Sequence, residues 1–119
     1  MGTTVVRPTR RISGHLRIPG DKSVSHRYAL LAAIADGRST ITNYAPGADC
    51  ASTLSCLTAL GVAVTRGPDG PDRHHVTIDG RGLGGLQAPD TPLDAGNSGT
   101  TVRLIAGILA GQAMTTTLV

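Results

Sequence analysis

The chain has 119 residues, which is enough for one modest domain and too few for two. Its core must come mostly from Ala, Val, Leu and Ile, because Phe and Trp are absent and only Tyr28 and Tyr44 are aromatic. The formal charge of +3 mildly favours anionic partners, but no basic run exceeds two residues and stacking aromatics are scarce, which argues against nucleic acid.

The targeting and redox signals are few. No segment is apolar over the roughly 20 residues of a membrane span, and the N-terminus lacks the apolar stretch of a signal peptide. Cys50 and Cys56 lie six positions apart, a spacing that fits neither a metal pair nor a disulfide framework. We therefore expect two reduced thiols in a soluble, cytoplasmic protein.

The first third of the chain predicts a strand, a helix and a second strand. Residues 1–13 are basic and irregular, and residues 15–18 alternate as a strand does before Pro19-Gly20 stops them. Residues 22–36 predict a helix that ends at Gly37, and residues 39–42 predict a short strand. The apolar stripe of this helix consists of Val24, Tyr28, Leu31 and Ala35.

The middle of the chain predicts a second helix and a hairpin. The helix runs near 49–60, with Asp49 as a candidate N-cap, Leu54 and Leu57 facing inward, and Gly61 as its end. Residues 62–66 predict a strand, 67–72 a turn and 74–79 the hairpin partner.

The last third begins the pattern again. Residues 80–92 predict a loop rich in Gly and Pro, and residues 98–110 predict a third helix that is apolar nearly all round and therefore buried. Residues 115–119 predict the start of another strand. The order β-α-β-α-β-β, followed by α-β, predicts an α/β (α+β) fold of repeated units, the second only begun.

An internal repeat joins the starts of the first and third helices. When Gly20 is set on Gly96, 76 positions later, "GDKSVSHR" lies over "GNSGTTVR" and Arg27 meets Arg103. A helix start carries free N–H groups and a partial positive charge, which favour an anion. Four hydroxyls could add hydrogen-bond donors, and each arginine could reach back over its helix start and bind a phosphate or carboxylate with two N–H groups. The hydroxyls belong to Ser23, Ser25, Thr100 and Thr101.

Simpler interpretations exist for each piece of this pattern. Either glycine stretch alone could be only a turn with an N-cap, and Arg27 could be a surface charge. Arg103 lies in an apolar helix, where a buried guanidinium would need a partner such as Asp49 or Asp94. The matched spacing of the two copies favours two anion sites side by side, one per repeat.

Lys22 is the chain's only lysine and stands at the first position of a predicted helix. Its ammonium could neutralise an anion or stabilise charge that develops in a transition state. Asp49 could cap its helix or polarise Lys22, and the cap is slightly favoured. His26 could act as an acid or base, but packing beside the site is favoured.

Other reactive side chains are assigned no chemistry. His74 and His75 alternate across a strand and cannot chelate one metal as a pair. Cys56 lies beside Leu57 in a helix and is expected in the core.

The two glycine motifs, together with the "DC--TL--L-ALGV" pattern of the second helix, resemble the enolpyruvylshikimate-phosphate synthases, also called 3-phosphoshikimate 1-carboxyvinyltransferases. The resemblance covers residues 12–119. The enolpyruvyltransferases that act on a UDP-aminosugar are more distant, since they carry Lys-Asn where this chain has Lys22-Ser23 and lack its arginine pattern.

The resemblance implies a fold and a reaction. The fold is a two-globe enzyme, each globe built of three βαβαββ units. The reaction joins the enolpyruvyl group of phosphoenolpyruvate to the 5-hydroxyl of shikimate 3-phosphate and releases phosphate. No metal or organic cofactor is implied.

The resemblance also implies residue roles. Lys22, Ser23 and Arg27 would hold shikimate 3-phosphate, and Lys22 would also touch phosphoenolpyruvate as the catalytic residue. The phosphoenolpyruvate pocket would be shaped by Asn97, Gly99, Thr100 and Arg103. Leu104 stands where some members have proline, so no sensitivity to the inhibitor glyphosate is predicted.

Family members are several times longer, so we expect an N-terminal fragment that is inactive alone. Residues 21–119 would form part of the substrate-binding globe, and residues 1–20 would pair with the second globe. The rest of the enzyme would supply the acid and base groups, and without it the third helix would expose an apolar patch. The alternative is a stand-alone anion-binding module, or a half-enzyme that needs a second chain.

Overall fold

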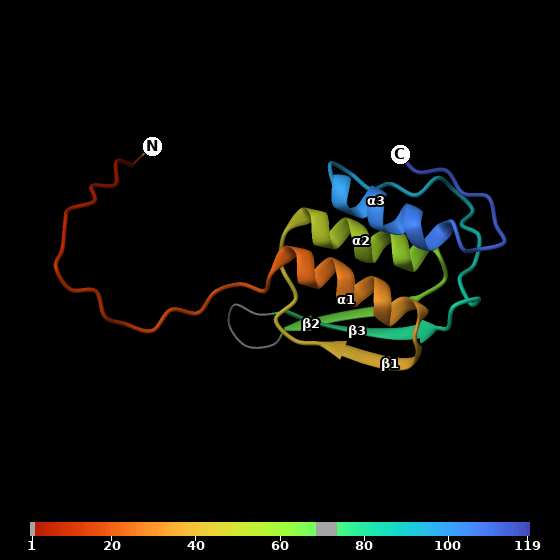
Figure 1. The fold of residues 1–119 in the computed structure, drawn as a ribbon, viewed down its shortest axis with the longest axis horizontal. Coiled ribbons are helices and arrows are strands. Elements are labelled where there is room, and N and C mark those ends of the chain that lie inside the picture. Colours follow the sequence, from red (N-terminus) through yellow and green to blue (C-terminus); the bar gives the residue numbers. More distant parts are fainter. Residues whose placement is uncertain (1, 69–73) are drawn as a thin grey trace.

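The computed structural model describes residues 2–68 and 74–119. Within these ranges the chain forms three helices and three strands (Figure 1). In chain order they are α1 (Lys22–Ile34), β1 (Asp36–Ile41), α2 (Ala48–Ala59), β2 (Ala63–Pro68), β3 (His74–Arg81) and α3 (Gly99–Leu109).

The strands form one antiparallel sheet in the order β1-β3-β2. Val76 in the central strand β3 lies opposite Ile41 of β1 and Arg66 of β2. This register confirms the predicted hairpin between β2 and β3, while residues 69–72 of its predicted turn lie outside the described residues. The result is a mixed sheet-and-helix fold of the predicted class.

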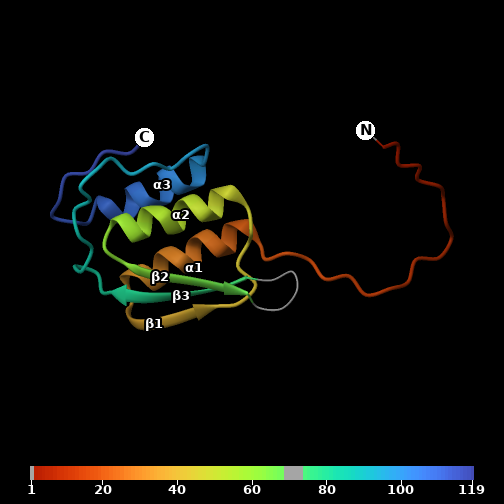
Figure 2. The ribbon, with the colours of Figure 1, turned by 180° about the vertical axis from the view of Figure 1, so that it is seen from behind.

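The helices are stacked on one face of this sheet. α1 contacts β1 and β3, α2 contacts β2, and α3 lies on α1 and α2 without touching a described strand (Figures 1 and 2). The core lies between the sheet and the first two helices, where Leu54, Leu57 and Ile78 are almost fully buried. The inward orientation predicted for the two leucines is therefore confirmed.

The predicted strand at residues 15–18 is wrong. These residues form no ladder, and Leu16 and Ile18 are exposed in a segment that leads away from the folded part (Figure 1). A strand needs a partner for its backbone groups, and none of the described strands pairs with it. Its alternating pattern is therefore not sufficient to form a strand.

The end of α1 also differs from the prediction. The helix ends at Ile34, and Ala35 adopts an extended backbone and bonds back to Leu31. β1 then begins at once, and Gly37 lies inside it with φ of 90°, opposite Gly80 of β3. Gly37 is thus a strand residue with a special conformation and not the helix stop.

The apolar stripe predicted for α1 does not face the core. Val24, Tyr28 and Leu31 are 45%, 57% and 59% exposed, whereas the buried face carries Leu30 together with small or polar residues. Ala and Ser allow α1 to lie close to the sheet and to α2. Tyr28 and Leu31 point outward, along the side of the helix next to β1.

α3 is a surface helix, so the prediction that it is buried is wrong. Only Thr101 and Ile105 are buried along its length, and Val102 is partly exposed. This agrees with the expected apolar patch. The predicted strand at residues 115–119 is reduced to one parallel bridge, in which Leu118 pairs with Leu93.

Candidate anion-binding site

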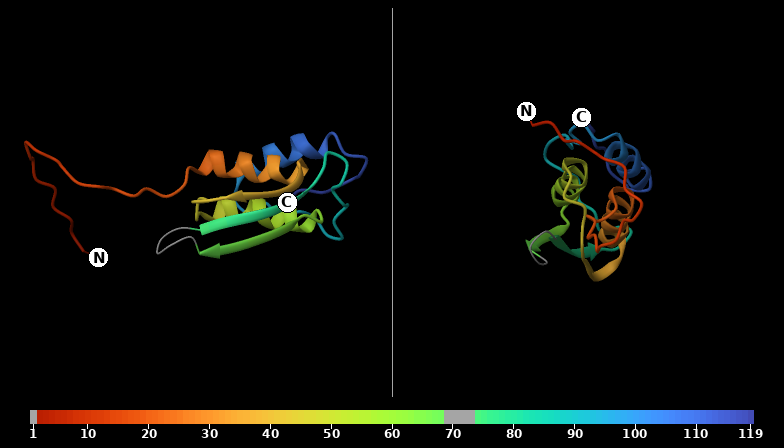
Figure 3. Two further views of the ribbon diagram at one scale, coloured as in Figure 1. Left: turned by 90° about the horizontal axis from the view of Figure 1, so that it is seen from below. Right: turned by 90° about the vertical axis from the view of Figure 1, so that its left-hand side faces the viewer.

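All three helices begin at the same end of the molecule, the end from which the N-terminal segment leaves (Figure 1; Figure 3, right). Side-chain contacts hold these starts together. The Cys50 thiol of α2 donates to the Lys22 carbonyl of α1 at 3.6 Å, and the Thr101 hydroxyl of α3 donates to the Asp49 carbonyl of α2 at 3.3 Å. The positive ends of three helix dipoles therefore converge, which favours an anion there.

The turn before α1 is fixed by backbone packing and by a cap. A Cβ atom at Gly20 would lie 1.7 Å from the Asn43 carbonyl oxygen, so only glycine fits. Asp21 is the N-cap, and its carboxylate accepts a 2.7 Å hydrogen bond from the Val24 N–H. The close approach of the Asn43 backbone therefore explains why position 20 is a glycine.

The turn before α3 uses the same design with a shift of one residue. Its N-cap is Ser98, whose hydroxyl accepts from the Thr101 N–H at 3.1 Å. Gly96 has φ of 58°, in the left-handed region that favours glycine. Asn97 is exposed just before the cap.

Arg27 and Arg103 make the same contact on their two helices. The Nη1 of Arg27 donates to the Ser23 carbonyl at 3.0 Å, and that of Arg103 donates to the Gly99 carbonyl at 3.3 Å. Both side chains therefore fold back toward the helix start, as the repeat predicts. Both arginines are exposed, and neither forms an ion pair with an acid among the described residues.

This geometry corrects the alternative for Arg103. The guanidinium is not buried, and Asp49 and Asp94 are not its partners. Gly99 matters for its position, because a Cβ atom there would lie 2.7 Å from Nη1 of Arg103. Glycine thus leaves room for the guanidinium to lie against the first turn of α3.

Lys22 pairs with Asp49 across the starts of α1 and α2. The hydrogen bond and the charge of Asp49 both raise the pKa of the Lys22 ammonium, which stays charged. The favoured role of Asp49 as an N-cap is wrong, because Gly47 caps α2 and Asp49 lies inside its first turn. Both side chains are partly exposed, so the ammonium remains accessible to a ligand.

The four hydroxyls near the helix starts divide into two kinds. Ser23 is exposed and Thr100 is partly exposed, so both can face a ligand. Ser25 and Thr101 are buried: Ser25 donates to the Asp21 carbonyl and accepts from the Ala45 N–H, which holds the loop after β1. The prediction that these two are ligand donors is therefore wrong.

His26 is fully buried, which confirms its predicted packing role. Its Nδ1 lies 2.7 Å from the Thr53 hydroxyl of α2, which in turn lies 2.8 Å from the Thr101 hydroxyl of α3. Burial lowers the pKa of the imidazole and the Lys22 charge lowers it further, so the ring is neutral at pH 7. Thr53 could not be identified from the sequence, because a threonine inside a helix gives no local signal of its partners.

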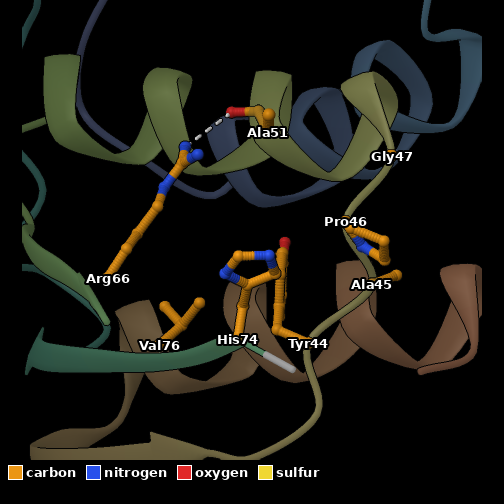
Figure 4. Close-up of a pocket in the computed structure, with 8 residues that line it drawn as sticks. All are labelled: Tyr44, Ala45, Pro46, Gly47, Ala51, Arg66, His74 and Val76. Carbon is orange, nitrogen blue, oxygen red and sulfur yellow. Dashed lines mark hydrogen bonds between the residues drawn. The ribbon is translucent and has the colours of Figure 1, made fainter. Parts of the chain in front are cut away.

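A small pocket lies beside this site, between α2 and the sheet (Figure 4). It has a volume of about 270 Å³, and both Tyr44 and His74 line it. Arg66 reaches from β2 to the Ala51 carbonyl of α2 at 3.3 Å. These residues stabilise the packing of α2 on the sheet.

The cysteines and histidines form no second chemical site. Cys50 and Cys56 are free and buried, and burial raises the pKa of both thiols, which makes them unreactive. Among the described residues, no three His, Cys or Asp side chains gather as a metal ion requires. None of the helices in the same ranges has the length and apolar character needed to cross a membrane.

Residues 6–119 match the family profile described as EPSP synthase (3-phosphoshikimate 1-carboxyvinyltransferase). The chain belongs to this family. The enzyme of this name from Alkalilimnicola ehrlichii is 51% identical over 113 residues, which are 95% of this chain and 24% of that one. The one from Solibacter usitatus is 50% identical over 111 residues, or 93% and 25% of the two chains.

Solved EPSP synthases share the fold. The structure of EPSP synthase from Acinetobacter baumannii aligns with a TM-score of 0.72 at 44% identity, covering 81% of this chain and 21% of that chain. The chain therefore spans about a quarter of the length of the curated EPSP synthases that it matches.

Proposed function

We propose that this chain carries the anion-holding helix starts of a 3-phosphoshikimate 1-carboxyvinyltransferase. The observation that carries the proposal is the matched pair of arginines. Arg27 and Arg103 both fold back over neighbouring helix starts, are exposed, and have no acidic partner among the described residues. Two such groups beside converging helix dipoles suit a reaction between two anionic substrates.

Shikimate 3-phosphate would lie at the start of α1. Its phosphate would accept from Arg27, from the Ser23 hydroxyl and from the Lys22 ammonium, which are on the first two turns of α1. Asp21 already caps this helix and is bonded to the Val24 N–H, so the side chains supply most of the positive charge.

Phosphoenolpyruvate would lie at the start of α3, near Asn97, Gly99, Thr100 and Arg103. Gly99 has no side chain, which leaves the first turn of α3 open and lets Arg103 lie against it. Lys22 would face both anions, since it pairs with Asp49 of α2, whose carbonyl in turn accepts from Thr101 at the start of α3.

The reaction would add the 5-hydroxyl of shikimate 3-phosphate to phosphoenolpyruvate and then eliminate phosphate. Lys22 would stabilise the negative charge that develops on the phosphoenolpyruvate oxygens, and Asp49 would orient its ammonium. Acid and base groups would come from the remainder of the enzyme, and residues 1–20 would pair with its second globe. We place the reaction in the cytoplasm, which the two unbridged thiols support.

The test is a calorimetric titration of shikimate 3-phosphate into a chain of family length that carries these residues. We expect Arg27→Ala to weaken binding by about 2–4 kcal/mol, because a charge-assisted contact is lost and the phosphate is left under-compensated. The control is Arg81→Ala, which removes the same charge at the far end of β3.

Unchanged affinity in Arg27→Ala would remove the α1 start from the substrate site. The 119-residue chain should be titrated as well. Tight binding of shikimate 3-phosphate by this chain alone would favour the alternative of an independent anion-binding module.

A further inference from the structure

A line of buried polar groups runs behind the three helix starts. His26 Nδ1 of α1 lies 2.7 Å from Oγ1 of Thr53 in α2, and this oxygen lies 2.8 Å from Oγ1 of Thr101 in α3. Thr101 continues the line to the Ser98 hydroxyl at 2.7 Å. All four side chains are at most 2% exposed, so water does not compete for these contacts.

The hydrogens of this line can be placed in one consistent direction. If His26 carries its proton on Nδ1, it donates to Thr53, and Thr53 donates to Thr101. The Thr101 hydroxyl then donates a hydrogen bond to the Asp49 carbonyl or to the Ser98 hydroxyl oxygen. The Nε2 atom of His26 keeps a lone pair with no partner among the described residues. This arrangement gives the His26 N–H and the Thr53 and Thr101 hydroxyls one acceptor each.

Thr53 has a special place in this line. Among the described residues no side-chain hydrogen bond joins α1 directly to α3, and the Thr53 hydroxyl is the one side-chain group that bonds to side chains of both. A second route runs through Asp49, whose carboxylate pairs with Lys22 and whose backbone carbonyl accepts from Thr101. His26 lies one turn after Lys22 and next to Arg27, and Thr101 lies two residues before Arg103. A change at Thr53 would therefore shift both ligand-facing arginines relative to each other.

We propose that Thr53 is a positioning residue, whose hydroxyl fixes the distance between the anion-holding starts of α1 and α3. This rests on the proposed function of those starts. Two substrates that must react with each other lose rate steeply when their separation changes by about 1 Å. α3 contacts no described strand, so its position depends entirely on its contacts with α1 and α2, of which this line of hydrogen bonds is a part.

The test compares three variants in a synthase of family length that carries these residues. Thr53→Val removes the hydroxyl and keeps the shape, Thr53→Ser keeps the hydroxyl, and Thr58→Val is the matched control in the same helix. Within residues 2–68 and 74–119, the Thr58 hydroxyl bonds only to the Leu54 carbonyl of its own helix. For each variant kcat and both KM values are measured on protein whose folding is checked by its melting curve.

We expect kcat/KM to fall roughly 10- to 100-fold in Thr53→Val, to stay within about 3-fold of wild type in Thr53→Ser, and to be unchanged in Thr58→Val. A loss of melting temperature in Thr53→Val with unchanged kcat and KM would overturn the proposal, since it would show a purely structural role. Equal losses in Thr53→Ser and Thr53→Val would also overturn it. If Thr53→Val does not fold, the Thr53→Ser result decides.

Arg27→Ala, assayed in parallel, separates this proposal from the one it rests on. If Arg27→Ala keeps wild-type affinity for shikimate 3-phosphate, the proposed function fails. If Arg27→Ala weakens binding while Thr53→Val behaves as Thr58→Val does, only the positioning role fails.

Discussion

Arg27 and Arg103 lie on different helices, but both side chains fold back toward the start of their own helix. Each guanidinium donates one N–H to the backbone carbonyl four residues earlier, and its other N–H donors have no partner among the described residues. A back-bonded arginine is partly ordered before a ligand arrives, so less side-chain entropy is lost on binding. Arginine suits both positions better than lysine, because its guanidinium can bond the helix carbonyl and still offer further N–H donors to a ligand.

Lys22 has a different task, and its variant should show a different kinetic signature. We expect Lys22→Ala to lower kcat more than it weakens substrate binding, because its charge would act on the negative charge that develops on the oxygen of the departing phosphate as the C–O bond breaks. Steady-state kinetics beside calorimetry measure the two effects. Equal losses in kcat and in affinity would make Lys22 a plain binding residue.

The buried His26 predicts how stability depends on pH. Its pKa is lowered in the folded state, so the unfolded chain takes up the proton first as the pH falls below about 6.5. The free energy of unfolding should therefore decrease from pH 6.5 downward, by at most about 1.4 kcal/mol per pH unit from this group. Lys22 and Arg27 lower this pKa and Asp49 raises it.

Urea unfolding of wild type and His26→Gln between pH 7 and pH 5 measures this effect. The His26→Gln variant should show a flatter profile over the same range. The other three histidines are the same in both proteins, so the comparison isolates His26. Parallel profiles would show that His26 does not bind its proton differently in the two states.

At the scale of elements, the sequence predicts what is decided locally. The helices predicted at 22–36, 49–60 and 98–110 are confirmed to within two residues at each end, and the pairing of β2 with β3 confirms the hairpin. The back-reaching arginines follow from their common distance to a helix start. The anion-binding interpretation of these starts stays a prediction.

Features that depend on how elements meet are not predicted. The outward stripe of α1 has the same period as an inward one, so its direction depends on which face packs more closely on the sheet. Asp49 pairs with Lys22 only because α1 and α2 begin side by side, and Thr53 finds its partners for the same reason. No local signal in the sequence carries this information.

The cap of α3 gives a direct test at this scale. We expect Ser98→Ala to lower the free energy of unfolding by about 1 kcal/mol, because the Thr101 N–H loses its acceptor in a buried position. Ser55→Ala is the control, since the exposed Ser55 hydroxyl bonds only to a carbonyl of its own helix. Urea unfolding measures both, and equal effects would show that the cap is not needed.

For the whole molecule, the candidate site depends on three helices that are held parallel with their starts at one end (Figure 3, right). The sheet positions α1 and α2, and these two helices carry α3. The two arginines thus belong to adjacent but distinct helix starts. This arrangement predicts two anion sites that can be disturbed separately.

The measurement that tests this claim most directly is a pair of KM values in a synthase of family length that carries these residues. Arg27→Ala should raise the KM for shikimate 3-phosphate about 30-fold or more and that for phosphoenolpyruvate only slightly, and Arg103→Ala should show the reverse pattern. Arg81→Ala should change neither value. If both arginine variants raise the two KM values equally, or change neither, the account of two separate anion sites is contradicted.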